Sequence, residues 1–136
     1  MKQASKTRLL ATVPLFSGCS KAELVQVASV ADELSLPAGA RLIREGERGR
    51  EFLVIVEGSV TVTKKGRKLC DLGAGNWVGE IALVTAQPRT ASVDATSAVR
   101  LLVITDRGFQ QLIRKTPTIA AKVLASLGER LAATTL

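Results

Sequence analysis

The sequence predicts an α+β fold in which a run of short antiparallel strands, forming a β-sandwich or β-roll, is flanked by helices. Residues 33–105 contain short apolar or alternating stretches separated by turns rich in glycine and proline. Before and after this region, apolar residues recur at helical spacing instead. With 136 residues, 46% of them hydrophobic, the chain is long enough for one domain with a buried core.

Two helices are expected in residues 1–31. Residues 1–12 form the first, and Pro14 ends it because proline has no backbone N–H to donate. The second begins with the capping box Ser20–Glu23, in which the serine and glutamate side chains each bond the other residue's backbone N–H. The apolar residues at helical spacing in this second helix are Leu24, Val27, Ala28 and Ala31.

The strands are expected in residues 32–105. Residues 51–57 carry apolar side chains at both odd and even positions, which is typical of a strand buried on both faces. Gly46, Gly58 and Gly75 interrupt the pattern and are interpreted as turn formers. The expected strands are residues 33–36, 40–44, 51–57, 59–64, 68–72, 91–95 and 99–105.

Two further helices are expected in residues 106–136. Asp106 caps the first, residues 107–115, and Pro117 separates it from the second, residues 118–133. The second helix carries an apolar stripe that suits a core or a dimer contact. The residues of this stripe are Ile119, Val123, Leu124, Leu127 and Leu131.

Composition excludes several kinds of site. The chain contains no histidine, which removes Ser-His-Asp and Cys-His catalysis and the usual histidine zinc sites, so we expect neither an enzyme nor a metal centre. Cys19 and Cys70 lie far apart, which favours reduced thiols and a cytoplasmic location. No apolar run approaches the ~20 residues of a membrane span, and no signal peptide is expected.

The formal net charge is +7, with small basic clusters at residues 41–50 and 64–68. One Trp, three Phe and no Tyr provide few platforms for stacking bases, so we expect no direct nucleic-acid contact. We interpret most of the charge as solvated loop positions. Attraction of anionic ligands or acidic membrane surfaces is the secondary interpretation.

Residues 76–93 contain the main candidate for a binding site. Gly79 and Glu80 open a short apolar turn that includes Ala82 and Leu83. The first N–H groups of a helical turn lack intrahelical partners, so those of Ala82 and Leu83 can bind an anion.

Two charged residues define what this site can hold. The guanidinium of Arg89 matches the oxygen geometry of phosphate. Glu80 repels phosphate but suits a sugar hydroxyl. The stretch therefore predicts a small anion that also carries hydroxyl groups.

The ordered run Gly-Glu-Ile-Ala-Leu at 79–83, followed by Pro-Arg-Thr-Ala-Ser at 88–92, resembles the phosphate-binding cassette of the cyclic nucleotide-binding domain family. The strand alternation is similar too, so the resemblance covers nearly the whole chain. It implies a single domain, residues 1–136, with an antiparallel, jelly-roll-like β-roll at 32–105 and the cassette at 76–93. N-terminal helices at 1–31 and two C-terminal helices at 106–136 flank this roll.

The resemblance also implies residue roles. Glu80 would bind the ribose 2′-hydroxyl and Arg89 the cyclic phosphate, assisted by the N–H groups of Ala82 and Ala91. Thr90 would lie beside the base, where a hydroxyl is associated with tolerance of guanine, so the resemblance favours cAMP and leaves cGMP open. No cofactor is implied beyond this ligand. The other expected site residues are Gly79, Ile81 and Leu83, with Leu127, Arg130 and Leu131 as candidate lid residues.

The implied function is that of a sensor domain in which ligand binding moves the C-terminal helices. An attached effector domain, or a homodimer through the last helix, would respond to that movement. The pattern resembles the regulatory domains of bacterial cyclic nucleotide-gated channels and the sensor half of Crp/Fnr-like transcription regulators. One alternative is a β-roll interaction module without a ligand. The other, a sugar-converting enzyme on a related roll, is disfavoured because the chain has no histidine or clustered acid pair for proton transfer.

Overall fold

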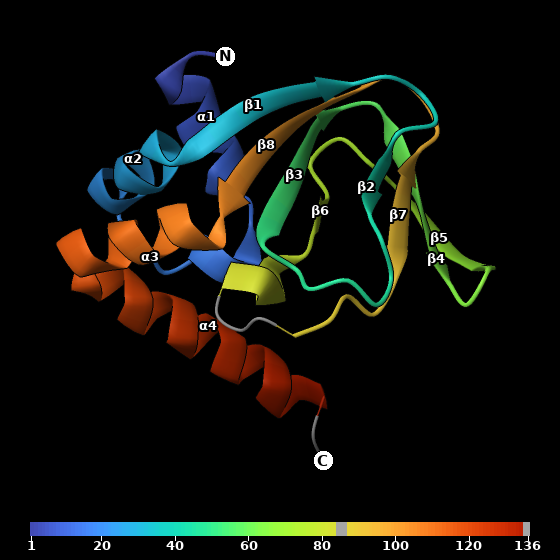
Figure 1. Cartoon of the computed structure of the whole chain (residues 1–136). Coiled ribbons are helices and arrows are strands. Elements are labelled where there is room, and N and C mark those ends of the chain that lie inside the picture. The colour runs from blue at the N-terminus through green and yellow to red at the C-terminus, as the bar shows by residue number, and fades with distance from the viewer. Residues whose placement is uncertain (84–86, 135–136) are drawn as a thin grey trace. The chain divides into compact units, whose positions relative to one another are not determined.

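The computed structural model describes residues 1–83 and 87–134, with the backbone alone at residues 80, 81 and 130–134. It divides the chain into two compact units (Figure 1). We call Asp32–Asp106 the β unit, and Met1–Ala31 with Arg107–Leu136 the helical unit. The predicted α+β class is confirmed.

The strands of the described residues form two four-stranded sheets (Figure 1). Their bounds are β1 Ala31–Leu36, β2 Arg41–Ile43, β3 Glu51–Glu57, β4 Ser59–Lys64, β5 Arg67–Gly73, β6 Trp77–Val78, β7 Ser92–Ala95 and β8 Val99–Thr105. One sheet has the strand order β1-β8-β3-β6 and the other β2-β7-β4-β5. The pairings that link β3 to β6 and β8, and β7 to β2 and β4, are antiparallel, as predicted.

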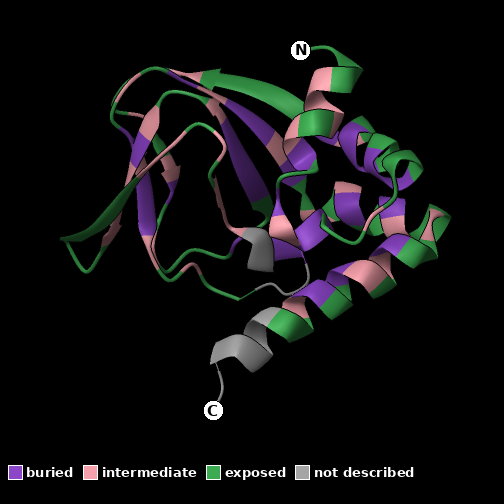
Figure 2. Ribbon diagram, turned by 180° about the vertical axis from the view of Figure 1, so that it is seen from behind, coloured by how far each residue is buried: buried purple, intermediate pink, exposed green. Residues whose placement is uncertain are grey.

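The core of the β unit lies between these sheets. Strand β3 is buried on both faces from Phe52 to Ile55, which confirms the prediction for residues 51–57 (Figure 2). Leu53 and Ile55 of β3 pack in one cluster with buried residues of both sheets. The other buried members of this cluster are Ile43, Val60, Val93, Ala95, Val99 and Leu101.

Glycines with positive φ form several turns of the β unit. Gly46, Gly58 and Gly75 all have positive φ, which confirms their interpretation as turn formers. Lys65 and Gly66 both have positive φ between β4 and β5, as a two-residue hairpin turn of type I′ requires. Strand β6 was not predicted, because two residues are too few to show a period.

Apart from Asp106, the first residue of α3, the helical unit contains α1 Gln3–Leu10, η1 Pro14–Phe16, α2 Lys21–Ser29, α3 Asp106–Lys115 and α4 Pro117–Thr134. The predicted capping box is confirmed, with the Glu23 N–H donating to Ser20 Oγ at 3.2 Å and the Ser20 N–H donating to Glu23 Oε1 at 2.8 Å. One expectation is wrong, because Ala31 belongs to β1 and not to the second helix. In the apolar stripe expected on the last helix, Ile119 and Val123 are buried, whereas Leu124 is 64% exposed, which suits a dimer contact and not the core.

A polar network fastens α4 to the N-terminal segment of the helical unit. Glu23, only 8% exposed, forms an ion pair with Lys122 and accepts a hydrogen bond from Thr118 Oγ1 at 2.7 Å. Ser126, also buried, donates through Oγ to the carbonyl oxygen of Pro14 at 2.7 Å. Since both contacts start from α4, they hold this helix to α2 and η1.

The network makes the stability of the helical unit depend on pH. The bond to Lys122, followed by those to the Ser20 N–H and to Thr118, lowers the pKa of Glu23 from 4.5 to about 2. A carboxylate with a lowered folded-state pKa stabilises the fold above its unfolded pKa, and this contribution disappears as the pH falls through the folded pKa. We therefore expect wild type to be more stable than Glu23→Gln above pH 4.5, with the difference shrinking toward pH 2.

Urea unfolding at pH steps from neutral down to about 2 measures this difference. Glu129→Gln removes an exposed carboxylate from the same helix as Lys122 and serves as the control. A wild-type advantage over Glu23→Gln that stays constant with pH would contradict the role assigned to the ion pair.

Candidate functional site

The backbone of Arg89 is held against the turn that precedes β3. Its N–H donates to the carbonyl oxygen of Glu47 at 2.7 Å, and its own carbonyl accepts from the Gly46 N–H at 2.8 Å. A third bond joins the Gly49 N–H to the carbonyl oxygen of Gln87 at 3.4 Å. The segment that carries the arginine is thus paired, at several points, with residues about forty positions earlier in the chain.

The side chain of Arg89 is nearly buried, with 11% of its area exposed. Nη1 donates to the carbonyl oxygen of Gly79 at 3.4 Å, and Nη2 donates to that of Glu51 at 2.5 Å. The carboxylate oxygen Oε2 of Glu51 lies 3.9 Å from Nη2. Burial lowers the pKa of the Arg89 guanidinium, and the charge of Glu51 opposes that shift.

Gly79 forms one wall of the arginine site. Its φ is +82°, a conformation that L side chains rarely adopt. A Cβ there would lie 2.4 Å from Nη1 of Arg89 and 2.8 Å from the carbonyl oxygen of Glu51. Glycine is therefore required at this position both by the backbone and by the guanidinium beside it.

The turn that follows Gly79 is the 3-10 helix η2, Glu80–Leu83. The N–H of Ala82 donates to the carbonyl oxygen of Gly79 at 3.0 Å, so this expected phosphate donor has a main-chain partner in the structure. The Ala82 and Leu83 side chains are buried. The side chains of Glu80 and Ile81 lie outside the described residues.

The remaining predicted residues fall on two elements. Thr90 is exposed and Ala91 half-buried immediately before β7. In α4, Leu127 is half-buried, whereas the side chains of Arg130 and Leu131 lie outside the described residues. The structure thus brings together Gly79, the η2 turn and Arg89 from the expected set.

Two residues of the arginine site are absent from the sequence prediction. Gly49 lies against the Arg89 side chain, and Glu51 supplies a carbonyl acceptor. Gly49 lies between the strands expected at residues 40–44 and 51–57, where a glycine by itself indicates a turn and not a contact with a distant side chain. A main-chain acceptor such as that of Glu51 has no sequence signature, because every residue has a carbonyl.

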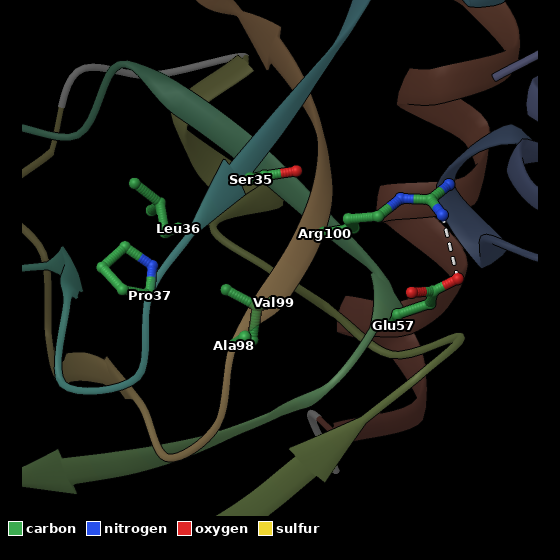
Figure 3. A pocket seen from close by; sticks show the side chains of 7 residues that line it. All are labelled: Ser35, Leu36, Pro37, Glu57, Ala98, Val99 and Arg100. Atoms are coloured by element: carbon green, nitrogen blue, oxygen red, sulfur yellow. Dashed lines mark hydrogen bonds and ion pairs between the residues drawn. The ribbon is translucent and has the colours of Figure 1, made fainter.

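One concavity of the β unit does not involve the cassette (Figure 3). This open depression of about 380 Å³ is lined by Ser35, Leu36, Pro37, Glu57, Ala98, Val99 and Arg100. The guanidinium of Arg100 donates to Glu57 at 2.9 Å and to Glu33 at 3.3 Å. Because two carboxylates already neutralise its cation, this depression is poorly suited to an anion.

At the arginine site, by contrast, main-chain carbonyl oxygens accept the hydrogen bonds of the guanidinium, and the carboxylate oxygen Oε2 of Glu51 lies 3.9 Å away. A family model described as "Cyclic nucleotide-binding domain" matches residues 33–116, more than half of the chain. The chain belongs to the cyclic nucleotide-binding domain family.

Three known proteins illustrate the relationship. This cyclic nucleotide-binding domain is 39% identical, over 90% of its length, to a cyclic nucleotide-gated potassium channel of Rhizobium etli, and covers 34% of that channel. It is 34% identical, over 82% of its length, to a cAMP-dependent protein kinase regulatory subunit of Mycosarcoma maydis, and covers 23% of that subunit. The chain therefore spans about a third or less of these two relatives.

Among solved structures, the N-terminal domain of a transcriptional regulator from Streptomyces coelicolor A3(2) superposes with a TM-score of 0.86 and 28% identity. The match covers 93% of this chain and 94% of that one. It confirms the predicted β-roll flanked by helices. In the described part of this domain, no helix combines the length and apolar character of a membrane crossing.

Proposed function

We propose that this cyclic nucleotide-binding domain is a sensor for cAMP, with cGMP as the alternative ligand, and that binding moves its C-terminal helices. The observation that carries the proposal is the state of Arg89. Its side chain is nearly buried, and its hydrogen bonds go to two main-chain carbonyls, with the Glu51 carboxylate oxygen at 3.9 Å. A desolvated cation held in this way keeps most of its charge available for a phosphate.

Different groups of the cassette would bind different parts of the ligand. Arg89 binds the cyclic phosphate, and Glu80 accepts a hydrogen bond from the ribose 2′-hydroxyl. The N–H groups of Ala82 and Ala91 add donors at the phosphate. In the structure Ala82 donates to the carbonyl of Gly79, so a phosphate must share or displace that bond. Gly79 and the buried Leu83 shape the turn, with Ile81 between them.

The response would pass through α4. Leu127, Arg130 and Leu131 of this helix are the proposed lid, and a shift in the populations of its positions on binding is the proposed output. The exposed Leu124, with the exposed Ala121 and Ala125 beside it, gives α4 an apolar side suited to a homodimer or an effector domain. The relatives' names include a channel and a kinase subunit, which are two different kinds of effector.

Titration calorimetry with cAMP and with cGMP tests the proposal. Even a weak sensor should give measurable heat with a dissociation constant of roughly 100 μM or lower. Absence of heat with both nucleotides in that range would favour the alternative, an interaction module whose cassette has lost its ligand.

Thr90 should influence the choice of base. We expect Thr90→Ala to weaken cGMP binding by about fivefold, the size of one lost hydrogen bond, and to change cAMP binding by less than about twofold. Thr96→Ala removes an exposed hydroxyl outside the cassette and is the control. Calorimetry with both ligands gives the ratio, and a larger loss for cAMP would rule out the proposed contact with the base.

A further inference from the structure

Gly49 lies against the middle of the Arg89 side chain. It is itself buried, and a Cβ at this position would lie 2.6 Å from Nε, 2.7 Å from Cζ and 2.9 Å from Cδ of the arginine. Non-bonded heavy atoms prefer separations of about 3.5–4.0 Å. The arginine can therefore occupy its site only while residue 49 has no side chain.

The backbone does not explain glycine at this position. Gly39, Gly46, Gly66 and Gly75 have positive φ, and a Cβ added to any of them would meet nothing within 4 Å, so their backbone conformation accounts for them. Gly49 has no positive φ, and an L residue can adopt its backbone conformation. What excludes a larger residue there is the arginine.

Neither segment is free to relieve the contact by moving. The Gly49 N–H bonds the carbonyl of Gln87, and the Arg89 N–H bonds the carbonyl of Glu47, so the two backbones are joined on either side of the contact. A methyl group at position 49 would instead displace the guanidinium from the carbonyls of Gly79 and Glu51 that orient it.

We infer that Gly49 is a positioning residue for nucleotide binding: its missing side chain lets Arg89 lie where it can meet a phosphate. This inference rests on the proposed role of Arg89 as the phosphate ligand. Gly79 forms the other wall, but its positive φ and its proximity to the Glu51 carbonyl would mix backbone strain with any effect on the arginine. Because Gly49 has no positive φ, its replacement by alanine tests the effect on the arginine without that backbone strain.

A double-mutant cycle tests the inference with wild type, Gly49→Ala, Arg89→Ala and the double variant. Gly49→Ala should weaken cAMP binding about tenfold or more in calorimetry, and by less than about twofold when Arg89 is already alanine. The urea unfolding midpoint of Gly49→Ala should stay close to that of wild type. If Gly49 had only a general structural role, this midpoint would fall. The matched control is Gly73→Ala, whose Cβ would lie at an ordinary 3.8 Å from the Gly58 carbonyl, and its affinity should equal that of wild type. An equal loss in both arginine backgrounds, or no loss in either, would overturn the inference.

A second measurement does not depend on any nucleotide. The Nε–Hε signal of Arg89, observed with ¹⁵N-arginine and assigned from its absence in Arg89→Ala, should shift in Gly49→Ala and stay in place in Gly73→Ala. An unchanged signal in Gly49→Ala would overturn the inference even if wild type bound ligand tightly. Failure of wild type to bind cAMP or cGMP would instead remove the proposed function and leave this structural result intact.

Discussion

We expect Arg89→Ala to bind cAMP about 30- to 700-fold more weakly than wild type, which corresponds to about 2–4 kcal/mol. The reason is the burial of the site. The Arg89 side chain is 11% exposed, so a phosphate that binds its guanidinium leaves water and depends on that cation for compensation. Titration calorimetry gives the affinities directly.

Two further variants make the experiment specific. Arg41→Ala removes the same charge from an exposed ion pair with Asp94 in the β unit, and its affinity should be close to that of wild type. Arg89→Lys keeps the charge but loses the planar fork, so its affinity should fall between those of wild type and Arg89→Ala. If Arg89→Ala bound cAMP as well as Arg41→Ala does, the proposed phosphate site would be wrong.

We expect Gly58→Ala to lower the free energy of unfolding by about 3 kcal/mol or more. Gly58 connects β3 to β4 with φ of +96°, and a Cβ there would lie 2.4 Å from the carbonyl oxygen of Ala98. That carbonyl belongs to a turn tied down by neighbouring bonds, from the Thr96 N–H to the Ser59 carbonyl and from the Ser59 N–H to Ser97 Oγ, each at 3.0 Å. The clash must therefore distort the backbone.

Gly39→Ala separates strain from clash. Gly39 has a similar φ of +87° but nothing within 4 Å of a Cβ, so its replacement should cost only the left-handed conformation, about 1–2 kcal/mol. Urea unfolding of both variants measures the difference. Equal losses would show that the approach of the Ala98 carbonyl has no energetic consequence.

Elements with a strong local signal were predicted well from the sequence. The predicted bounds of β3 agree with the structure because seven consecutive residues, with apolar side chains on both faces, leave few alternatives. The capping box at Ser20 and Glu23 is equally local, since both partners lie within one helical turn. Strand β6 was missed because Trp77 and Val78 become a strand only by pairing with β3.

The part of the candidate site with a local sequence signal was also predicted. The order of residues from Gly79 to Arg89 lies within one continuous stretch, so the sequence contains it. The carbonyl of Glu51 and the contact with Gly49 come from a segment about forty residues earlier, and neither a main-chain acceptor nor a missing side chain indicates its partner. Similarly, helical spacing did not distinguish Leu124, which is exposed, from Val123, which is buried.

The sequence by itself determined the order of helices and strands, the glycines of the turns and the cassette with its single arginine, because these depend on residues close together in the chain. Only the tertiary structure decided where the Arg89 guanidinium lies, which carbonyls hold it and why residue 49 has no side chain. These features arise where two distant segments pair, and the resulting distances between atoms are set by packing and hydrogen bonding across the fold.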